Sequence, residues 1–204
     1  MYSTVKHVVV AALLLATSTF TPHASGASPD VVRGAGGMVV SRSMLASEVG
    51  RDIMQGGGNA VDAAVATAFA LAVTYPSAGN LGGGGFMVIR LADGRYTVND
   101  HREVAPMAAH RDMYLDEAGN PVRELSRSTH LAVGVPGSVA GLLDALERYG
   151  KLPRRTVMAP AIALAEDGFE LPYDIAQQFV RQADALARFP AGASAFRKAD
   201  GSAY

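Results

Sequence analysis

The strongest constraint on the fold of this chain is an alanine-rich segment that follows three consecutive glycines. Asn59 comes directly after the glycines at 56–58, and seven of the fourteen residues at 60–73 are alanine. Asparagine is a favoured residue just before a helix, and Tyr75-Pro76 ends the segment because the residue before a proline avoids helical backbone. Small side chains all around a helix let neighbouring elements approach closely. We therefore predict a helix over 60–73 at the centre of the core.

Four further helices are predicted around this central one. The first begins after Ser43, whose hydroxyl can cap it, and ends at the glycines. The second is opened by Ser138, which we also expect to act as its cap. The expected ranges are 44–55, 138–149, 159–167 with Pro160 in the first turn, and 173–188 before a break at Phe189-Pro190.

Alternating residues indicate a β-hairpin in the middle of the chain. Its strands, 86–91 and 96–100, flank Asp93-Gly94, which is expected to supply the positive φ angles of a tight turn. The segment 106–129 is predicted to be a polar surface excursion with a turn at 117–121, and a second turn is expected at 198–201. The hairpin therefore sets the direction in which the chain continues after residue 100.

The first 27 residues have the organisation of a secretory signal peptide. Lys6 precedes the apolar run 8–16, and a stretch of small and polar residues ends at Ser25-Gly26-Ala27. A membrane anchor is the alternative, but the run is about half of the roughly 20 residues that a bilayer requires. We expect cleavage after Ala27 and a mature chain of residues 28–204 without a stable membrane span. A bacterial periplasmic or secreted location follows, where a large core makes disulfides unnecessary.

The composition excludes several kinds of function. The 204 residues include no cysteine, which excludes a thiolate nucleophile, a disulfide framework and a cysteine-bound zinc. A net charge of −1 with 18% charged residues gives no cationic surface for nucleic acid. The histidines at 101, 110 and 130 lack metal-ligand spacing, and we expect neither a metal nor an organic cofactor.

Two glycine-containing motifs suggest chemistry that their surroundings do not support. The four glycines at 82–85 could form an anion-binding nest, but no Lys-Ser or Lys-Thr follows as in a P-loop. They either let the backbone pass close to the alanine-rich helix, which we favour, or supply amides that line a pocket or stabilise an oxyanion. In Gly137-Ser138-Val139-Ala140-Gly141 the serine stands one place too early for a nucleophile elbow.

Arg102 is the candidate for substrate binding that remains. It lies in Asp100-His101-Arg102-Glu103, just after the second strand of the predicted hairpin. A guanidinium can hold a carboxylate with two parallel hydrogen bonds, which a point charge cannot do. The alternative is a surface ion pair with Asp100 or Glu103, which composition alone would favour.

Six segments, in the same order along the chain, resemble the large subunit of the gamma-glutamyltranspeptidases. The similarity extends from about residue 35 to the last residue, and six motifs in order are highly specific. They are GMVV from Gly37 with LASEVG from Leu45, GGGNAVDAAVATAFAL from Gly56, GGGGFM from Gly82, DHREVAP from Asp100, AVGVPGSVAG from Ala132, and LAEDGF from Leu164.

The resemblance implies an α/β fold of the N-terminal-nucleophile hydrolase type, an αββα sandwich that is incomplete here. Family members are made as precursors that cut themselves into a large and a small subunit. The threonine freed at the start of the small subunit attacks the γ-amide of glutathione, and the γ-glutamyl group passes to water or to an amino acid or peptide. The arginine of the family's R-E-x-A-P string holds the substrate α-carboxylate, and that string is Arg102-Glu103-Val104-Ala105-Pro106 here.

The resemblance also predicts what the chain lacks. We expect it to end inside the large-subunit region, so that the nucleophilic threonine lies beyond Tyr204 and no catalytic residue is present. Ser128-Thr129-His130 is similar to the processing string, but it directly precedes AVGVPG, so Thr129 is not the nucleophile. The implied partners are γ-glutamyl substrates such as glutathione and the missing C-terminal part with the small subunit. A related glutaryl-cephalosporin acylase and a non-catalytic fragment remain alternatives.

Overall fold

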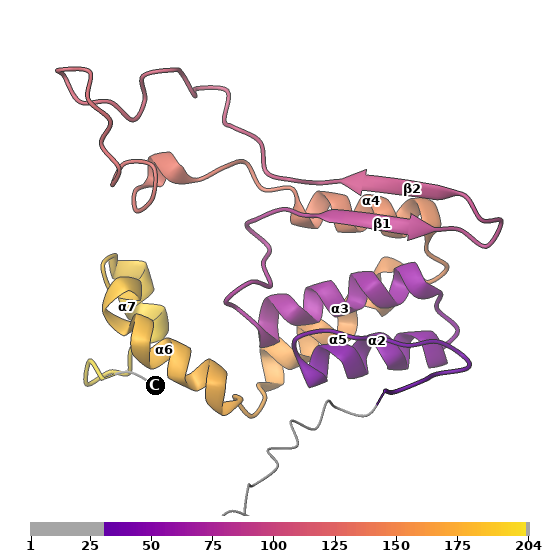
Figure 1. Ribbon diagram of the computed structural model, residues 1–204. Helices are drawn as coiled ribbons and strands as arrows, with labels where there is room; N and C mark the ends of the chain where they lie inside the picture. Colours follow the sequence, from indigo (N-terminus) through magenta and orange to yellow (C-terminus); the bar gives the residue numbers. More distant parts are fainter. Residues whose placement is uncertain (1–30, 203–204) are drawn as a thin grey trace, which may run out of the picture. The chain divides into compact units, whose positions relative to one another are not determined.

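The computed structural model describes residues 31–202 of the chain (Figure 1). The predicted signal peptide, residues 1–27, lies outside these residues. The chain divides into two units, Met1–Gly37 and Met38–Tyr204, and the description below concerns the second. No helix among the described residues combines the length and the apolar character needed to cross a membrane.

Helices dominate the described residues, with one β-hairpin between them (Figure 1). The elements in chain order are α2 (Met44–Gln55), α3 (Ala60–Thr74), β1 (Phe86–Arg90), β2 (Tyr96–Asp100), the 3-10 turn η1 (His130–Ala132), α4 (Ser138–Tyr149), α5 (Arg154–Asp167), α6 (Tyr173–Leu186) and α7 (Pro190–Phe196).

The first two helices form as predicted because each has a local start signal and glycines separate them. The Ser43 hydroxyl accepts a hydrogen bond from the backbone N–H of Ala46 at 3.4 Å. Asn59 caps α3 by accepting from the N–H groups of Val61 and Asp62 at 2.9 and 3.1 Å. Between them, Gly57 has a φ of 96°, a conformation that glycine adopts without strain.

The alanine-rich helix α3 is the centre of the core, as the sequence predicts. It packs against α2 and α5 on its long sides and also contacts α4 (Figure 1). Most of its residues are buried, including three alanines that are at most 2% exposed. The core residues that surround it come from α2, β1, α4 and α5, and they are Ala46, Ile53, Ile89, Leu142, Ala145, Leu146, Val157 and Ala161.

The hairpin β1–β2 has the predicted antiparallel pairing, with Val88 opposite Val98. The turn that joins the strands differs from the expectation in one detail. Gly94 has a φ of 88°, but no residue other than glycine has a positive φ among those described. Asp93 instead stabilises the turn with its carboxylate, which accepts from the Arg95 N–H at 3.0 Å. The Arg95 contacts lower the pKa of Asp93 from its ordinary value.

The helix α4 begins at the predicted residue but is not capped as predicted. Gly137 is its N-cap residue, and no side chain caps it. The carbonyl of Gly83 accepts from the N–H groups of Gly137 and Ser138 at 2.8 and 3.0 Å. The Ser138 hydroxyl, in a residue 5% exposed, donates instead to Oδ1 of Asn80 at 2.6 Å. Because a distant carbonyl satisfies the first N–H groups, the serine is available for a tertiary contact.

The later helices show two further departures from the predicted pattern. The helix α5 starts at Arg154 rather than residue 159, after Pro153, so Pro160 lies inside the helix and not in its first turn. The missing N–H of Pro160 removes one intrahelical bond, yet the buried Val157 and Ala161 hold this part of α5 to the core. The break expected at Phe189-Pro190 is real, but Pro190 is the first residue of another helix, α7.

The segment between β2 and η1 contains no helix or strand, as expected for a surface excursion. Its tip is the predicted turn, in which the Asp116 carboxylate accepts from the N–H groups of Asn120 and Ala118 at 2.8 and 2.9 Å. These hydrogen bonds, that of Asn120 foremost, lower the pKa of Asp116 from its ordinary value of 3.8. A second turn at Lys198–Gly201 is also present, closed by the Gly201 N–H to the Lys198 carbonyl at 2.9 Å.

A buried carboxylate connects the start of α3 to the loop between α4 and α5. Asp62 is 0% exposed, and its oxygens accept from the N–H groups of Asn59, Lys151 and Leu152 at 2.7–3.0 Å. The Asn59 amide adds a bond to the carbonyl of Tyr149 at 2.7 Å. A Cβ at Gly150 would lie 2.7 Å from an Asp62 oxygen, so glycine is required for this approach. The charge is therefore balanced by N–H groups and by the positive end of α3.

We expect Asp62→Ala to lower the free energy of unfolding by about 3–5 kcal/mol, because it leaves several part-buried N–H groups without an acceptor. Urea unfolding followed by circular dichroism measures the change. The control is Asp52→Ala, which removes an exposed carboxylate paired with Arg51. Asp52→Ala should lower the free energy of unfolding by less than about 1 kcal/mol. Equal losses in the two variants would show that Asp62 does not hold the α4–α5 loop.

Candidate functional site

Arg102 lies on an extended segment that is fixed at both ends. On one side, the N–H of His101 donates to the Gly85 carbonyl at 3.0 Å, and the N–H of Gly85 donates back at 3.3 Å. On the other side, Val104 and Val135 exchange the same pair of bonds at 3.3 and 2.8 Å. The segment thus continues β2, leaves β1 after His101 and joins the stretch before α4. Arg102 is held between the two anchors.

Glycines on both sides make room for this segment. A Cβ at Gly84 would lie 2.6 Å from both the backbone N of Glu103 and the carbonyl O of His101. A Cβ at Gly137 would collide with the carbonyl of His101, and one at Gly141 with the His101 side chain. Gly84, Gly137 and Gly141 therefore allow a close approach of this segment.

The predicted role of the four-glycine run, a close approach of its backbone to another part of the chain, is thus supported. The neighbour is different from the one expected. Gly84 and Gly85 lie against residues 101–103 and not against the alanine-rich helix. Close to this run in sequence, Gly79 does approach α3, where a Cβ would collide with the carbonyl of Leu71. Two amides of the run are already engaged, since the N–H of Gly83 donates to Asn80 and that of Gly85 to His101.

The side chain of Arg102 takes part in none of the ion pairs formed among residues 31–202. The predicted alternative, a surface ion pair with Asp100 or Glu103, is therefore not formed. Asp100 instead accepts from the backbone N–H of Arg102 at 3.1 Å. This bond stabilises the extended segment and leaves the guanidinium able to bind a ligand.

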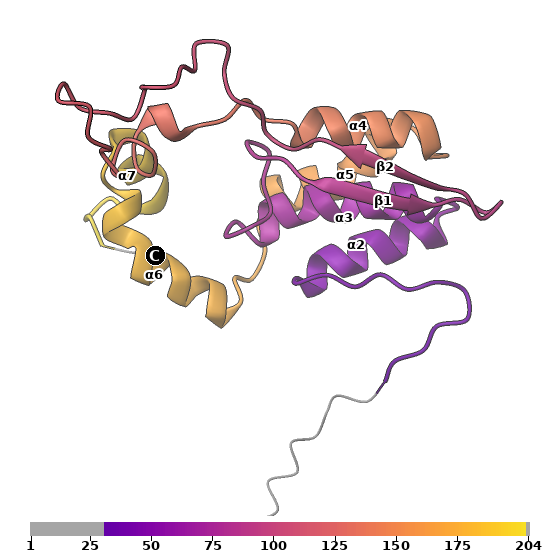
Figure 2. The ribbon, with the colours of Figure 1, turned by 45° about the horizontal axis from the view of Figure 1, so that its top comes forward.

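Arg102 lines a hollow of about 490 Å³ between its own segment and the stretch before α4. All the lining residues belong to the long connection from β2 to α4, whose course Figure 2 shows. Apart from Arg102 and Glu103 the lining is uncharged and largely apolar: Val104, Ala105, Pro106, Ala109, Met113, Tyr114, Leu131, Ala132, Val133 and Gly134. The Tyr114 hydroxyl donates to the carbonyl of Leu131 at 3.1 Å and joins the two walls. A guanidinium beside an apolar wall suits a carboxylate on a small organic molecule.

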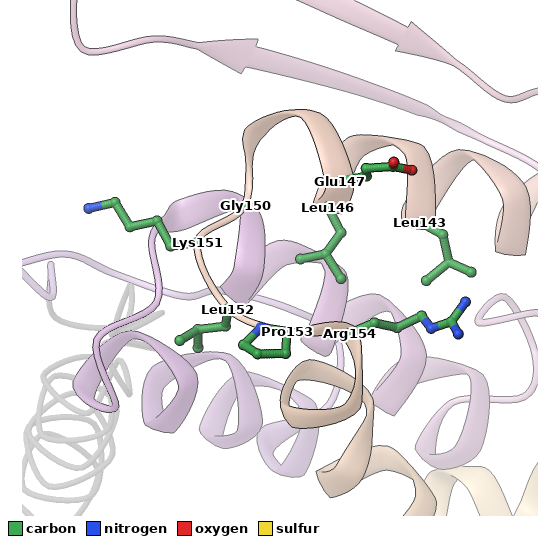
Figure 3. A pocket seen from close by; sticks show the side chains of 8 residues that line it. All are labelled: Leu143, Leu146, Glu147, Gly150, Lys151, Leu152, Pro153 and Arg154. Carbon is green, nitrogen blue, oxygen red and sulfur yellow. The ribbon is translucent and has the colours of Figure 1, made fainter.

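A second hollow, of about 470 Å³, lies where α4 passes into α5 (Figure 3). Leu143 and Leu146 point into it from α4, and the charged side chains around it are Glu147, Lys151 and Arg154. The backbone at 151 and 152 in its wall is the part held by the buried Asp62 carboxylate. This hollow is thus next to the structural clamp, and it contains no side chain that the sequence predicts to be functional.

The described residues 31–202 hold no group of three or more histidine, aspartate or glutamate side chains arranged to bind a metal ion. Thr129 is used locally, since its hydroxyl donates to the carbonyl of Leu125 at 2.8 Å and accepts from the N–H of Leu131 at 3.3 Å. Ser138 bonds to an asparagine and not to a base. Neither hydroxyl is placed as an activated nucleophile.

Sequence reasoning missed the polar side chains that support this region. Asn80 connects the glycine run to α4, and Asn99 on β2 donates to Asp144 on α4 at 2.8 Å. Asn99 and Asp144 are 45 residues apart, and neither belongs to a spacing pattern. Only the position of Asn99, two residues before His101 on the same strand face, hinted at a shared role.

The sequence profile of the gamma-glutamyltranspeptidase family matches residues 46–204. The chain belongs to this family. A glutathione hydrolase proenzyme from Pseudomonas sp. (strain A14) is 51% identical over 160 residues, which are 78% of this chain and 28% of that protein. The acylase ACY 1 proenzyme of Pseudomonas sp. (strain V22) is 44% identical over 163 residues, 77% of this chain and 29% of that protein.

The solved structures agree with the sequence comparison. The crystal structure of Helicobacter pylori gamma-glutamyltranspeptidase superposes with a TM-score of 0.82 at 41% identity, covering 85% of this chain and 50% of that one. The predicted α/β fold of the N-terminal-nucleophile hydrolase type is thereby confirmed for this member of the family. This chain spans less than a third of the length of the curated relatives above, which are 28% and 29% covered.

We expect Gly84→Ala to lower the free energy of unfolding by about 1–3 kcal/mol, because the added methyl group meets backbone atoms that cannot rotate away. Gly82→Ala is the matched control in the same run, since a Cβ there meets nothing within 4 Å. Its effect should stay within about 0.5 kcal/mol. Urea unfolding of both variants measures the difference. A tolerated alanine at 84 would refute the close approach to residues 101–103.

Proposed function

We propose that this chain is the N-terminal part of the precursor of an exported gamma-glutamyltranspeptidase, and that Arg102 binds the α-carboxylate of the γ-glutamyl group. The observation that supports the proposal is the position of Arg102. It lies in the R-E-x-A-P string, between two backbone anchors, on the wall of a hollow of about 490 Å³. Relatives over this region carry the name glutathione hydrolase.

The geometry suits recognition of a carboxylate. The guanidinium presents parallel N–H donors, and neither Asp100 nor Glu103 competes for them through an ion pair. Both anchors are pairs of backbone hydrogen bonds, so they hold the backbone of Arg102 in place before substrate binds. Because the backbone around Arg102 is already ordered, less conformational entropy is lost when a ligand binds.

The reaction itself requires groups that these residues do not provide. A threonine hydroxyl attacks the γ-carbonyl, the amine leaves with a proton, and an acyl ester remains that water or an acceptor amine resolves. We propose that this threonine belongs to a small subunit outside the 204 residues. The chain by itself is then inactive and contributes to binding. Glutathione and similar γ-glutamyl compounds are the proposed substrates.

The outer face of the hairpin supports the need for a further layer of structure. Phe86, Val88, Tyr96 and Val98 lie on this face with 60–71% of their surface exposed. Their neighbours in sequence, such as Ile89 at 7%, turn toward the core. A contiguous apolar face of this kind is costly in water. We propose that the remainder of the αββα sandwich covers it.

Export is the proposed route of this protein. The leader at residues 1–27 has the order of a signal peptide, and cleavage after Ala27 would release the chain to a bacterial periplasm or exterior. A chain without cysteine folds there without a disulfide step.

We expect Arg102→Lys to lower kcat/KM for γ-glutamyl anilide by roughly 10- to 100-fold, because an ammonium cannot reproduce the planar two-bond contact. The enzyme is expressed from the whole reading frame and assayed after self-cleavage. Arg123→Lys is the control, since Arg123 is an exposed arginine that does not line the hollow. An unchanged kcat/KM in Arg102→Lys would remove Arg102 from the binding site.

An acylase for glutaryl-cephalosporins is the second candidate, because an acylase proenzyme is 44% identical over 163 residues. A glutaryl group keeps the carboxylate that Arg102 would bind but lacks the α-amino group of a γ-glutamyl group, so a site built for γ-glutamyl substrates leaves the contacts to that amino group unmade. We therefore expect the enzyme from the whole reading frame to prefer γ-glutamyl anilide over glutaryl-cephalosporin. The ratio of the two kcat/KM values measures the preference, and a higher value for the cephalosporin would establish the second candidate.

A further inference from the structure

A series of side-chain hydrogen bonds runs from α4 to the end of β2, next to Arg102. Nδ2 of Asn99 donates to Oδ2 of Asp144 at 2.8 Å. Oδ1 of Asn99 lies 2.7 Å from Nδ1 of His101. Arg148, one turn further along α4, donates to the same Asp144 oxygen at 3.4 Å. The proposed binding role of Arg102 leaves these four side chains unexplained.

The chemistry of the groups fixes the direction of each bond. An ionised carboxylate only accepts, so the NH₂ group of Asn99 must face Asp144. The carbonyl oxygen of Asn99 then faces His101, and because a carbonyl cannot donate, the proton must lie on Nδ1 of the imidazole. Asp144 and Asn99 therefore select one tautomer and one ring orientation of His101.

The surroundings of His101 leave this ring little room to move. His101 is half-buried, and a Cβ at Gly141 on α4 would collide with its side chain. On its other edge, Nε2 lies 3.1 Å from where a Cβ of Gly85 would be. Its backbone is one of the two anchors of the segment that carries Arg102. Alternation along an extended chain directs the next side chain, Arg102, to the opposite face.

We infer that His101 is a positioning residue for substrate binding, whose Nδ1–H bond to Asn99, which is itself bonded to Asp144, fixes the strand end beside α4 and sets the place of Arg102. This inference rests on the proposed function, in which Arg102 binds the substrate carboxylate. His101 does not itself contact the reacting atoms. Its loss should therefore weaken substrate binding and leave the chemical step unchanged.

The test compares His101→Asn with His101→Gln and His101→Phe in the enzyme from the whole reading frame. The side-chain nitrogen of asparagine is two bonds from Cβ, as Nδ1 of histidine is, so His101→Asn can still donate to Asn99. Glutamine places its nitrogen one bond further out, near the position of Nε2, and phenylalanine has no donor. We expect KM for γ-glutamyl anilide to rise roughly tenfold in His101→Phe and His101→Gln with kcat within twofold, and to return close to the parent value in His101→Asn.

His110→Phe is the matched control, since His110 is an exposed histidine of the surface excursion that makes no side-chain bond to α4. Its KM and kcat should equal those of the parent. A purely structural role of His101 would raise KM equally in all three His101 variants or lower the yield of self-cleaved enzyme. Equal KM values in His101→Asn and His101→Phe, or an effect that falls on kcat, would overturn the inference.

A double-mutant cycle with Arg102 completes the experiment. If His101 acts through Arg102, His101→Phe should raise KM less than twofold in an Arg102→Lys background, whereas independent effects multiply. If the effects of the two substitutions on KM multiply fully, the inference is overturned and the proposed function stays in place. No change of kcat/KM in Arg102→Lys alone would instead overturn the proposed function, and the positioning role with it.

Discussion

The rest of the structure depends on the buried carboxylate of Asp62. A charge without contact to water is costly, and here it is stabilised by backbone N–H groups from two distant parts of the chain rather than by a cation. The loop from α4 to α5 is thereby fixed at the start of the central helix α3. The place of α4 follows from that loop, and α4 in turn supports the segment that carries Arg102.

Glycines leave room for the backbone segment that carries the candidate binding residue. The segment after β2 passes between the glycine run before β1 and the glycines at the start of α4, where side chains would collide with its backbone. Hydrogen bonds on either side of Arg102 hold it extended. Gly84 and Gly85, in the run that could have formed an anion nest, are packing positions, and the proposed binding group is the side chain of Arg102.

Elements with local signals were predictable, and those decided by distant contacts were not. The Ser43 and Asn59 caps, the glycines after α2 and the Gly94 turn each act within a few residues, so α2, α3 and the hairpin were correct. Ser138 carries the hydroxyl of a typical helix cap, but the Gly83 carbonyl, 55 residues earlier, satisfies the helix start instead. The start of α5 differs from the prediction because Pro160, a residue compatible with a first turn, lies inside a helix that begins after Pro153.

The sequence by itself determined the family motifs, the central helix and the identity of Arg102 as the candidate for carboxylate binding. These depend on residue type and short spacing, which are properties of the linear chain. Only the tertiary structure decided that Arg102 makes no ion pair with its neighbours, that it lines a hollow, and that Asn99 and Asp144 orient His101 beside it. Hydrogen bonds between residues far apart in sequence leave no periodic pattern, because their partners are chosen by how helices and strands pack.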